Sequence, residues 1–262
     1  MDQGPKQLNN SKFSGTEVNY LFMGNPGTGK STLINCLVGS PIFDSGLSYG
    51  GGMTKNFQAR THENVRYMDT PGLADRNIQE MAASAITEAL QQSGTYKLFF
   101  MVRLENGRVV SDDLATIEIV LSSIDLEEIP FGIIVNNVKK RQYTKMMEKG
   151  ADYLKVVTLI NSINHMTPHI TFIPVLDDLD EEDNAVTDLP GEVESFIRFE
   201  CPAVPISRQI VKPIKIEDFK KISEKLRDVQ EELLRDNALL ERRIAELTKK
   251  SNCFQKMATV LW

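Results

Sequence analysis

Short apolar runs alternate with segments of helical periodicity along most of this chain. Apolar runs of about 4–8 residues bounded by turn residues are typical of buried strands, whereas apolar positions three and four apart are typical of helices. Alternating strands and helices predict a mainly parallel sheet covered by helices on both faces, a three-layer α/β domain. The predicted strands are residues 18–23, 57–60, 65–68, 97–102, 131–135 and 170–175, and the predicted helices are residues 32–38, 78–92, 111–123, 143–164 and 191–199.

The pattern divides the chain into four parts. Residues 1–16 are polar and predict a loose arm, and residues 17–200 hold the α/β domain. Residues 201–215 contain three prolines and predict a linker. Residues 216–262 form a C-terminal helical extension, in which one long helix is expected from 216 to about 250.

That long helix carries apolar residues on one side and charges of both signs elsewhere. Asp236 and Arg243 occupy positions of the apolar seam where a coiled coil places apolar residues. The sequence therefore favours packing on the α/β domain, or a short helical pairing, over an extended coiled coil.

The first predicted strand leads directly into residues 24–31, GNPGTGKS, which match the phosphate-binding pattern G-x-x-x-x-G-K-[ST]. Strand, glycine loop and helix follow in the order that this motif requires, which argues against a chance match. Lys30 is expected to reach the β- and γ-phosphates, and the Ser31 hydroxyl is expected to ligate Mg²⁺. The predicted nucleotide contacts here are Gly24, Asn25, Pro26, Gly27, Thr28, Gly29, Lys30, Ser31 and Thr32.

A second motif, Asp69-Thr70-Pro71-Gly72, follows the third predicted strand. Asp69 is expected to hold Mg²⁺ through a water, and the Gly72 N–H is expected to contact the γ-phosphate. Thr54 lies in the glycine-rich stretch between the two motifs, and its hydroxyl would complete the Mg²⁺ shell. The alternatives are an ordinary turn for the motif and a solvent-exposed threonine for Thr54.

Composition narrows the function classes. The formal net charge is −6, so no overall basic field attracts nucleic acid. The three cysteines are far apart, which favours neither a zinc site nor a disulfide framework. No stretch approaches the roughly 20 apolar residues of a membrane span, so we expect a cytoplasmic protein. The acidic run 177–183 predicts a solvated loop, with an acid-lined metal site as the alternative.

Several separate segments together resemble the immunity-associated GTPases, the GIMAP family. Residues 24–31 with the following Leu-Ile-Asn resemble its phosphate loop, residues 52–58 its switch I and residues 69–75 its switch II. Residues 99–108, FFMVRLENGR, with two aspartates at 112 and 113, resemble the block that marks this family among small GTPases. The resemblance covers about residues 17–200.

The resemblance implies binding of GTP or GDP with Mg²⁺, slow hydrolysis, and nucleotide-dependent pairing of copies through their nucleotide faces. Leu73 stands where Ras-like enzymes carry a glutamine that orients the attacking water, so hydrolysis is expected to need help in trans. Arg108, in the marker block, is our candidate for an arginine that reaches a partner subunit, with Arg103 as the second candidate. The alternative for both is a surface arginine.

The base-reading motif departs from the GTPase pattern. GTPases usually carry N/T-K-x-D after this strand, whereas this chain has Asn136-Asn137-Val138-Lys139. Asn136 is expected to contact the base still, but a lysine replaces the carboxylate that accepts two hydrogen bonds from guanine. The alternatives are another acceptor, with Asp177 and Asp178 as candidates, relaxed base choice, or adenine.

Three functional hypotheses follow. The chain is a slow GTPase that acts as a nucleotide-controlled switch or oligomerising scaffold; it is an ATPase or promiscuous NTPase; or it is a module that binds nucleotide without hydrolysing it. We favour the first.

Overall fold

The computed structural model describes residues 17–46, 53–75 and 77–260, with the backbone alone for residues 249–260. The described strands are β1 (Val18–Gly24), β2 (Gln58–His62), β3 (Val65–Asp69), β4 (Gly94–Glu105), β5 (Arg108–Val109), β6 (Gly132–Val138), β7 (Ile170–Pro174) and β8 (Val204–Ile206). The described α-helices are α1 (Lys30–Val38), α2 (Gln79–Leu90), α3 (Ser111–Ser122), α4 (Lys140–Met147), α5 (Ala151–Ile160), α6 (Gly191–Ser195) and α7 (Phe219–Val260).

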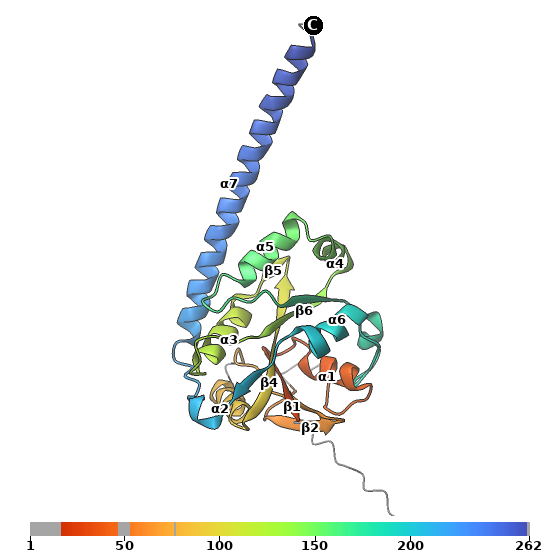
Figure 1. The fold of residues 1–262 in the computed structure, drawn as a ribbon, viewed down its shortest axis with the longest axis vertical. Helices are drawn as coiled ribbons and strands as arrows, with labels where there is room; N and C mark the ends of the chain where they lie inside the picture. The colour runs from red at the N-terminus through yellow and green to blue at the C-terminus, as the bar shows by residue number, and fades with distance from the viewer. Residues whose placement is uncertain (1–16, 47–52, 76, 261–262) are drawn as a thin grey trace, which may run out of the picture.

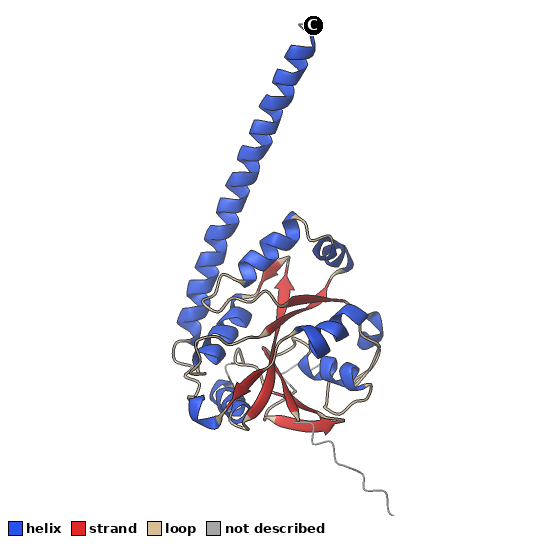
Figure 2. Cartoon of the chain, in the orientation of Figure 1, coloured by secondary structure: helices blue, strands red, loops and turns tan. Residues whose placement is uncertain are grey.

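The strands form one twisted sheet in the order β2-β3-β1-β4-β6-β7 (Figures 1 and 2). Strands β3, β1, β4, β6 and β7 run parallel, and β2 pairs with β3 in the antiparallel direction. Helices cover both faces. The predicted fold class, an α/β P-loop domain with a mainly parallel sheet and a long C-terminal helix, is therefore confirmed.

The apolar runs of the strands supply both cores, because successive side chains of a strand point to opposite faces of a sheet. One core lies between the sheet and α1 and α6, and the other lies between the sheet and α2, α3, α5 and α7. Neighbouring residues of β1 and β4 divide accordingly: Tyr20, Phe22, Phe99 and Met101 belong to the first core, and Leu21, Met23, Leu98 and Phe100 to the second.

Parallel pairing brings the carboxyl ends of several strands to one edge of the sheet. Gly24, which ends β1, lies opposite Met101 of β4, and Phe22 lies opposite Asp69 of β3. Asn136 of β6 lies opposite Arg103 of β4. The sequence motifs that end these strands therefore meet at one edge, as ligand-binding residues do in open α/β sheets.

The structure differs from the helix predicted over residues 143–164. Two helices occupy this region, α4 and α5, and they are separated by residues 148–150. Lys149 has a φ of 50°, a left-handed conformation that ends α4 before Gly150. Helical spacing of apolar residues continues across the break, which is why the pattern alone does not reveal it.

The predicted linker 201–215 contributes to the domain. β8 pairs antiparallel with the first residues of β4, where Val204 lies opposite Tyr96 and Ile206 opposite Gly94. Val204 and Ile206 are both buried. This segment therefore adds a strand to the sheet before the chain enters α7.

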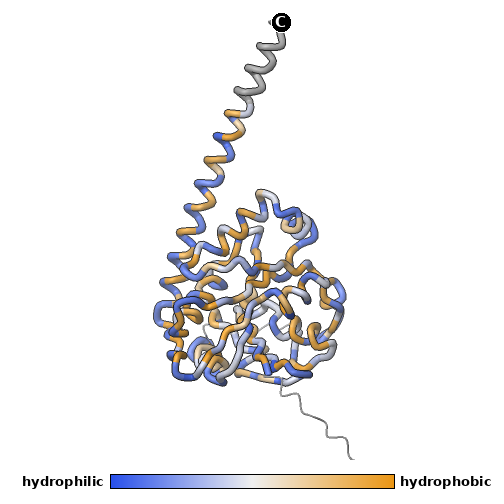
Figure 3. Tube along the Cα trace, in the orientation of Figure 1, coloured by the Kyte–Doolittle hydropathy of each residue, from blue (hydrophilic) through white to orange (hydrophobic). Residues whose placement is uncertain are grey.

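The first part of α7 packs against α3, and Leu233 and Leu234 still pack on the core. Farther along, Glu241 forms an ion pair with Lys155 of α5, and beyond it the helix extends away from the domain (Figure 1). Phe219 and Leu226 are buried, whereas Leu240, Ile244 and Leu247 are each about 60% exposed. Apolar and charged residues alternate along the extended part (Figure 3). In the described part of the chain, no helix combines the length and apolar character that a membrane span requires.

Candidate nucleotide site

The phosphate loop (residues 24–31) turns from β1 into α1 through two glycines in the left-handed region. Gly27 has a φ of 74° and Gly29 a φ of 87°. A Cβ on Gly29 would stand 2.5 Å from Nδ2 of Asn136, so both the conformation and the space require glycine there. Asn136 Nδ2 donates to the carbonyl oxygen of Thr28 at 2.9 Å, which ties the end of β6 to the loop.

The Lys30 side chain folds back over the loop. Its Nζ donates to the carbonyl oxygens of Gly24 at 2.9 Å and of Asn25 at 3.3 Å, and the residue is buried. Burial lowers the pKa of Lys30, while the carboxylates of Asp69 and Asp113 act in the opposite direction. A buried ammonium at the mouth of a loop of this shape would be stabilised by a phosphate anion.

The three predicted Mg²⁺-site residues converge at the start of α1. Asp69 Oδ2 accepts hydrogen bonds from the Ser31 hydroxyl at 2.7 Å and from the Thr54 hydroxyl at 2.8 Å. The two hydroxyl oxygens lie 3.3 Å apart. Asp69 Oδ1 is fully buried without a hydrogen-bond partner, and burial raises the pKa of this carboxyl.

This donor set fits Mg²⁺. The ion prefers hard oxygen ligands and keeps several waters, as two hydroxyls and one carboxylate that acts through water would allow. The orphaned Oδ1 of Asp69 is a buried acceptor that lacks a donor, and a metal-bound water would supply one. Bound there, the ion would neutralise charge on the β- and γ-phosphate oxygens.

We expect Asp69→Asn to abolish the contribution of Mg²⁺ to nucleotide affinity, because the variant lacks the charge that holds the ion. Wild-type affinity for a triphosphate should fall by about tenfold or more when EDTA replaces Mg²⁺, and the variant should show little difference. Calorimetric titration in both buffers measures this. Asp75→Asn, an equivalent change close by in switch II, is the control, and a variant that keeps the full Mg²⁺ effect would contradict the assignment.

Switch II, residues 69–75, packs directly on the phosphate loop. A Cβ on Gly72 would stand 2.4 Å from Cδ of Pro26 and 2.7 Å from the carbonyl carbon of Asn25, so only glycine permits this approach. Leu73 is fully buried in the core on the α2 and α3 face. It therefore lacks both the polar group and the position to orient an attacking water.

Asn25 connects the phosphate loop to switch II and to α3. Its Nδ2 donates to Asp113 Oδ1 at 2.8 Å, and its Oδ1 accepts from the Ala74 N–H and the Thr116 hydroxyl, each at 3.0 Å. Asp113 also accepts from the Arg103 N–H at 2.9 Å and pairs with its guanidinium at 3.4 Å. The sequence placed Asp113 in the marker block but gave no sign of its contact with Asn25, and it did not point to Thr116, because these interactions join residues 88 and 91 positions apart.

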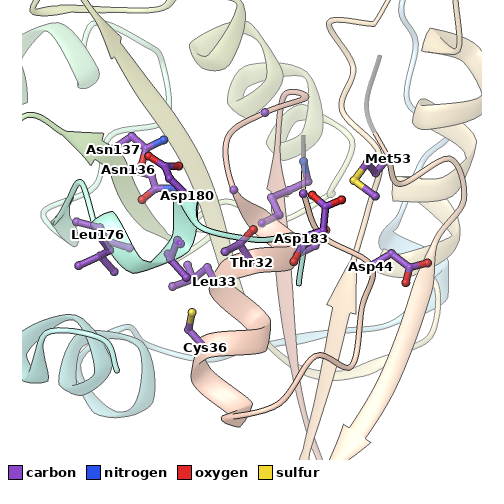
Figure 4. A pocket seen from close by; sticks show the side chains of 18 of the residues that line it. Thr32, Leu33, Cys36, Asp44, Met53, Asn136, Asn137, Leu176, Asp180 and Asp183 are labelled. Carbon is purple, nitrogen blue, oxygen red and sulfur yellow. The ribbon is translucent and has the colours of Figure 1, made fainter. Parts of the chain in front are cut away.

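A cavity of about 930 Å³ opens beside the phosphate loop (Figure 4). At one end of the view lie Asn136, Asn137, Leu176 and Asp180, and toward the other lie Asp44 and Met53. Of the predicted site residues, the cavity is lined by Pro26, Gly27, Gly29, Lys30, Ser31, Thr32, Thr54, Gly72 and Asn136.

The remaining predicted site residues do not line this cavity. Asn25, Thr28 and Asp69 are buried, and so is Gly24, the first residue of the loop. Arg108 lies farther along the β4–β5 hairpin, where it lines a separate cavity with Arg227 and Gln230 of α7. Whether Arg108 reaches the nucleotide of a partner subunit depends on how two copies would pair, so this role stays a prediction. Arg103, the second candidate, is held by Asp113.

Residues 19–137 match the model of a family described as 50S ribosome-binding GTPase. This segment runs from β1 through the phosphate loop and both switches to the end of β6. No curated protein matches the sequence.

Solved structures of GTPases are similar to this one. Toc33 from Arabidopsis thaliana, in complex with Mg²⁺ and GMPPNP, is 16% identical with a TM-score of 0.47, covering 73% of this chain and 89% of that chain. Era from Aquifex aeolicus, bound to GDP·AlF4⁻, is 20% identical with a TM-score of 0.43, covering 76% and 63%. NFeoB from S. thermophilus, bound to GDP·AlF4⁻ and K⁺, is 15% identical with a TM-score of 0.37, covering 59% and 55%.

Proposed function

We propose that this chain, which has the P-loop GTPase fold, binds GTP and GDP with Mg²⁺ and hydrolyses GTP slowly as a nucleotide-controlled switch or oligomerising scaffold. The observation that carries the proposal is the convergence of Ser31, Thr54 and Asp69 beside the buried Lys30. The marker block at residues 99–108 supports placing the chain near the immunity-associated GTPases. A cytoplasmic location, expected from the sequence, is part of the proposal.

The chain's own groups account for phosphate binding. Backbone N–H groups of the loop and the N-terminus of α1 would bind a phosphate anion, and Lys30 would supply the positive charge. Thr54 and Gly72 reach the same cavity from the two switch segments. A γ-phosphate would therefore contact both switches, and its loss on hydrolysis would release them.

The described site supports slow rather than fast hydrolysis. The attacking water in Ras-like enzymes is oriented by a carboxamide, and the equivalent side chain here, Leu73, is buried in the core. A second copy that contributes Arg108 or Arg103 would add charge stabilisation in the transition state. The proposal thus includes nucleotide-dependent homodimers as the faster hydrolysing form.

The first experiment compares affinities for GDP, a non-hydrolysable GTP analogue and the matching ATP analogue, each with Mg²⁺. A guanine preference of about a hundredfold or more, roughly 2.7 kcal/mol, is the expected result. The rate of phosphate release from GTP should then increase more than proportionally with protein concentration, because paired copies would hydrolyse GTP faster. Equal or tighter ATP binding would overturn the guanine assignment, and absent phosphate release at every concentration would overturn hydrolysis.

A promiscuous or adenine-directed NTPase is the second candidate, and one observation favours it. Lys139 replaces the aspartate of the usual base-reading motif, and it lies outside the residues that line the cavity. The affinity comparison above separates this candidate from the first.

A further inference from the structure

We infer that the Asp180 carboxylate reads the guanine base in place of the missing motif aspartate, by accepting hydrogen bonds from N1–H and the N2 amino group. The inference rests on the proposed function, because it requires a nucleotide in this cavity. It concerns base choice alone, and phosphate binding by the loop does not depend on it.

The end of β6 does not supply the acceptor. The Nδ2 of Asn136 is engaged by the Thr28 carbonyl, so this side chain holds the phosphate loop. Asn137 lines the cavity from a left-handed conformation, with a φ of 55°, but its amide carries no charge. Lys139 precedes α4 on the surface, away from the cavity lining. A carboxylate that meets the base edge must come from another element.

Five acidic residues line the cavity, and their positions separate them. Asp180 lies beside Asn136 and Asn137, whereas Asp44 and Asp183 lie farther away, beyond Thr32 (Figure 4). The other two, Glu181 and Glu182, follow Asp180 along the loop. Asp177 and Asp178, our candidates from the sequence, do not line the cavity. Asp178 instead accepts a hydrogen bond from the Thr187 hydroxyl at 3.0 Å.

The segment that carries Asp180 is anchored on both sides. It is a single 3-10 turn (Asp177–Asp180), and just before it the Val175 N–H donates to the Val138 carbonyl at 3.1 Å. After it, Asn184 exchanges two hydrogen bonds of 2.8 Å with the backbone of Ser45. Leu176 lies at the same end of the cavity as Asp180 (Figure 4), and Leu179 also lines the cavity, so both offer apolar surface to a base. These hydrogen bonds fix the turn that carries Asp180, and a residue that recognises a base must be held in a fixed position.

The chemistry selects guanine. Guanine presents two adjacent donors, N1–H and N2–H, which one carboxylate can accept together. Adenine presents an acceptor at the equivalent ring position. The carboxylate would therefore face a lone pair, and it would lose hydrogen bonds to water without gaining any from the base. Asp180 is exposed in the free chain, and a bound base would cover it. The preference for guanine over adenine therefore arises when the bound base removes the carboxylate from water.

The Asp180→Asn substitution distinguishes base recognition from a purely structural role, because only base recognition predicts a change of preferred base. A carboxamide donates to the second carbonyl of xanthine and accepts from its N1–H, so the variant should exchange one base for the other. We expect GDP affinity to fall by about tenfold or more and XDP affinity to rise by a similar factor, measured by calorimetry with Mg²⁺. Asp180→Ala should lose GDP affinity without gaining XDP affinity.

Matched controls separate this inference from the proposed function. Asp178→Asn makes the same change in the same turn, outside the cavity, and should leave both affinities unchanged. A wild-type chain that binds no guanine nucleotide overturns the proposed function. A wild-type chain that prefers GDP, together with an Asp180→Asn variant that behaves as wild type, overturns the Asp180 assignment alone. An exchange of bases in Glu181→Gln or Glu182→Gln instead would also overturn it.

Discussion

Replacing Lys30 with methionine should remove nucleotide binding while the fold survives. Methionine keeps the length and apolar stem of the buried side chain but not the ammonium, whose burial already lowers its pKa. What is lost is a charged contact with the β- and γ-phosphates in a buried setting. We expect triphosphate affinity to fall at least a hundredfold, or about 3 kcal/mol.

Calorimetric titration of the variant with a non-hydrolysable GTP analogue measures this loss. Thermal unfolding in the absence of nucleotide checks that the variant is folded. Lys55→Met removes an exposed lysine that follows Thr54 directly and should bind nucleotide as wild type does. If Lys30→Met kept wild-type affinity, the assignment of residues 24–31 as the phosphate loop would have to be abandoned.

Asn25→Ala should be the most destabilising of the site substitutions. The amide is fully buried and joins the phosphate loop to switch II and α3 through three hydrogen bonds. Its removal leaves the Ala74 N–H without its acceptor and takes a donor from the buried Asp113 carboxylate. Unsatisfied buried groups of this kind cost about 1–3 kcal/mol each, so we expect a loss of about 3 kcal/mol in the free energy of unfolding.

Urea unfolding of the nucleotide-free variant measures the loss, and hydrogen exchange at the Ala74 amide reports switch II directly. That amide should exchange faster than in the wild type by more than the global destabilisation explains. Thr116→Val removes a single donor to the same amide oxygen and should cost about 1 kcal/mol. Asn77→Ala, at an exposed position, should change little. Unaltered exchange at Ala74 would mean that Asn25 does not hold switch II.

The candidate site was predictable where the chemistry is local in the sequence. The phosphate loop is a contiguous run whose glycines, lysine and serine are set by the backbone path and the anion, and the flanking strand and helix are readable from apolar spacing. Asp69 and Gly72 were predictable for the same reason, because they end a strand that must pair near β1. Thr54 joined them as the hydroxyl between the two motifs.

The parts that were not predictable depend on contacts between distant residues. The break between α4 and α5 at Lys149 leaves the apolar spacing intact, so periodicity does not report it. β8 is a short strand between prolines, and only its pairing with β4 makes it part of the sheet. Asp180 stands in an acidic run that predicted a solvated loop, and its place in the cavity follows from the anchored turn.

By itself, the sequence determined the α/β fold, the phosphate loop and the absence of a water-orienting carboxamide after Gly72. Each of these depends on adjacent residues or on the short-range spacing of apolar residues. The tertiary structure decided which side chains complete the site. It buried Leu73 in the core, joined Asn25 to Asp113 and Thr116, directed Arg108 toward α7, and placed Asp180 rather than Asp177 or Asp178 in the cavity. These are distances between residues far apart in the chain, and only the packing of helices on the sheet sets them.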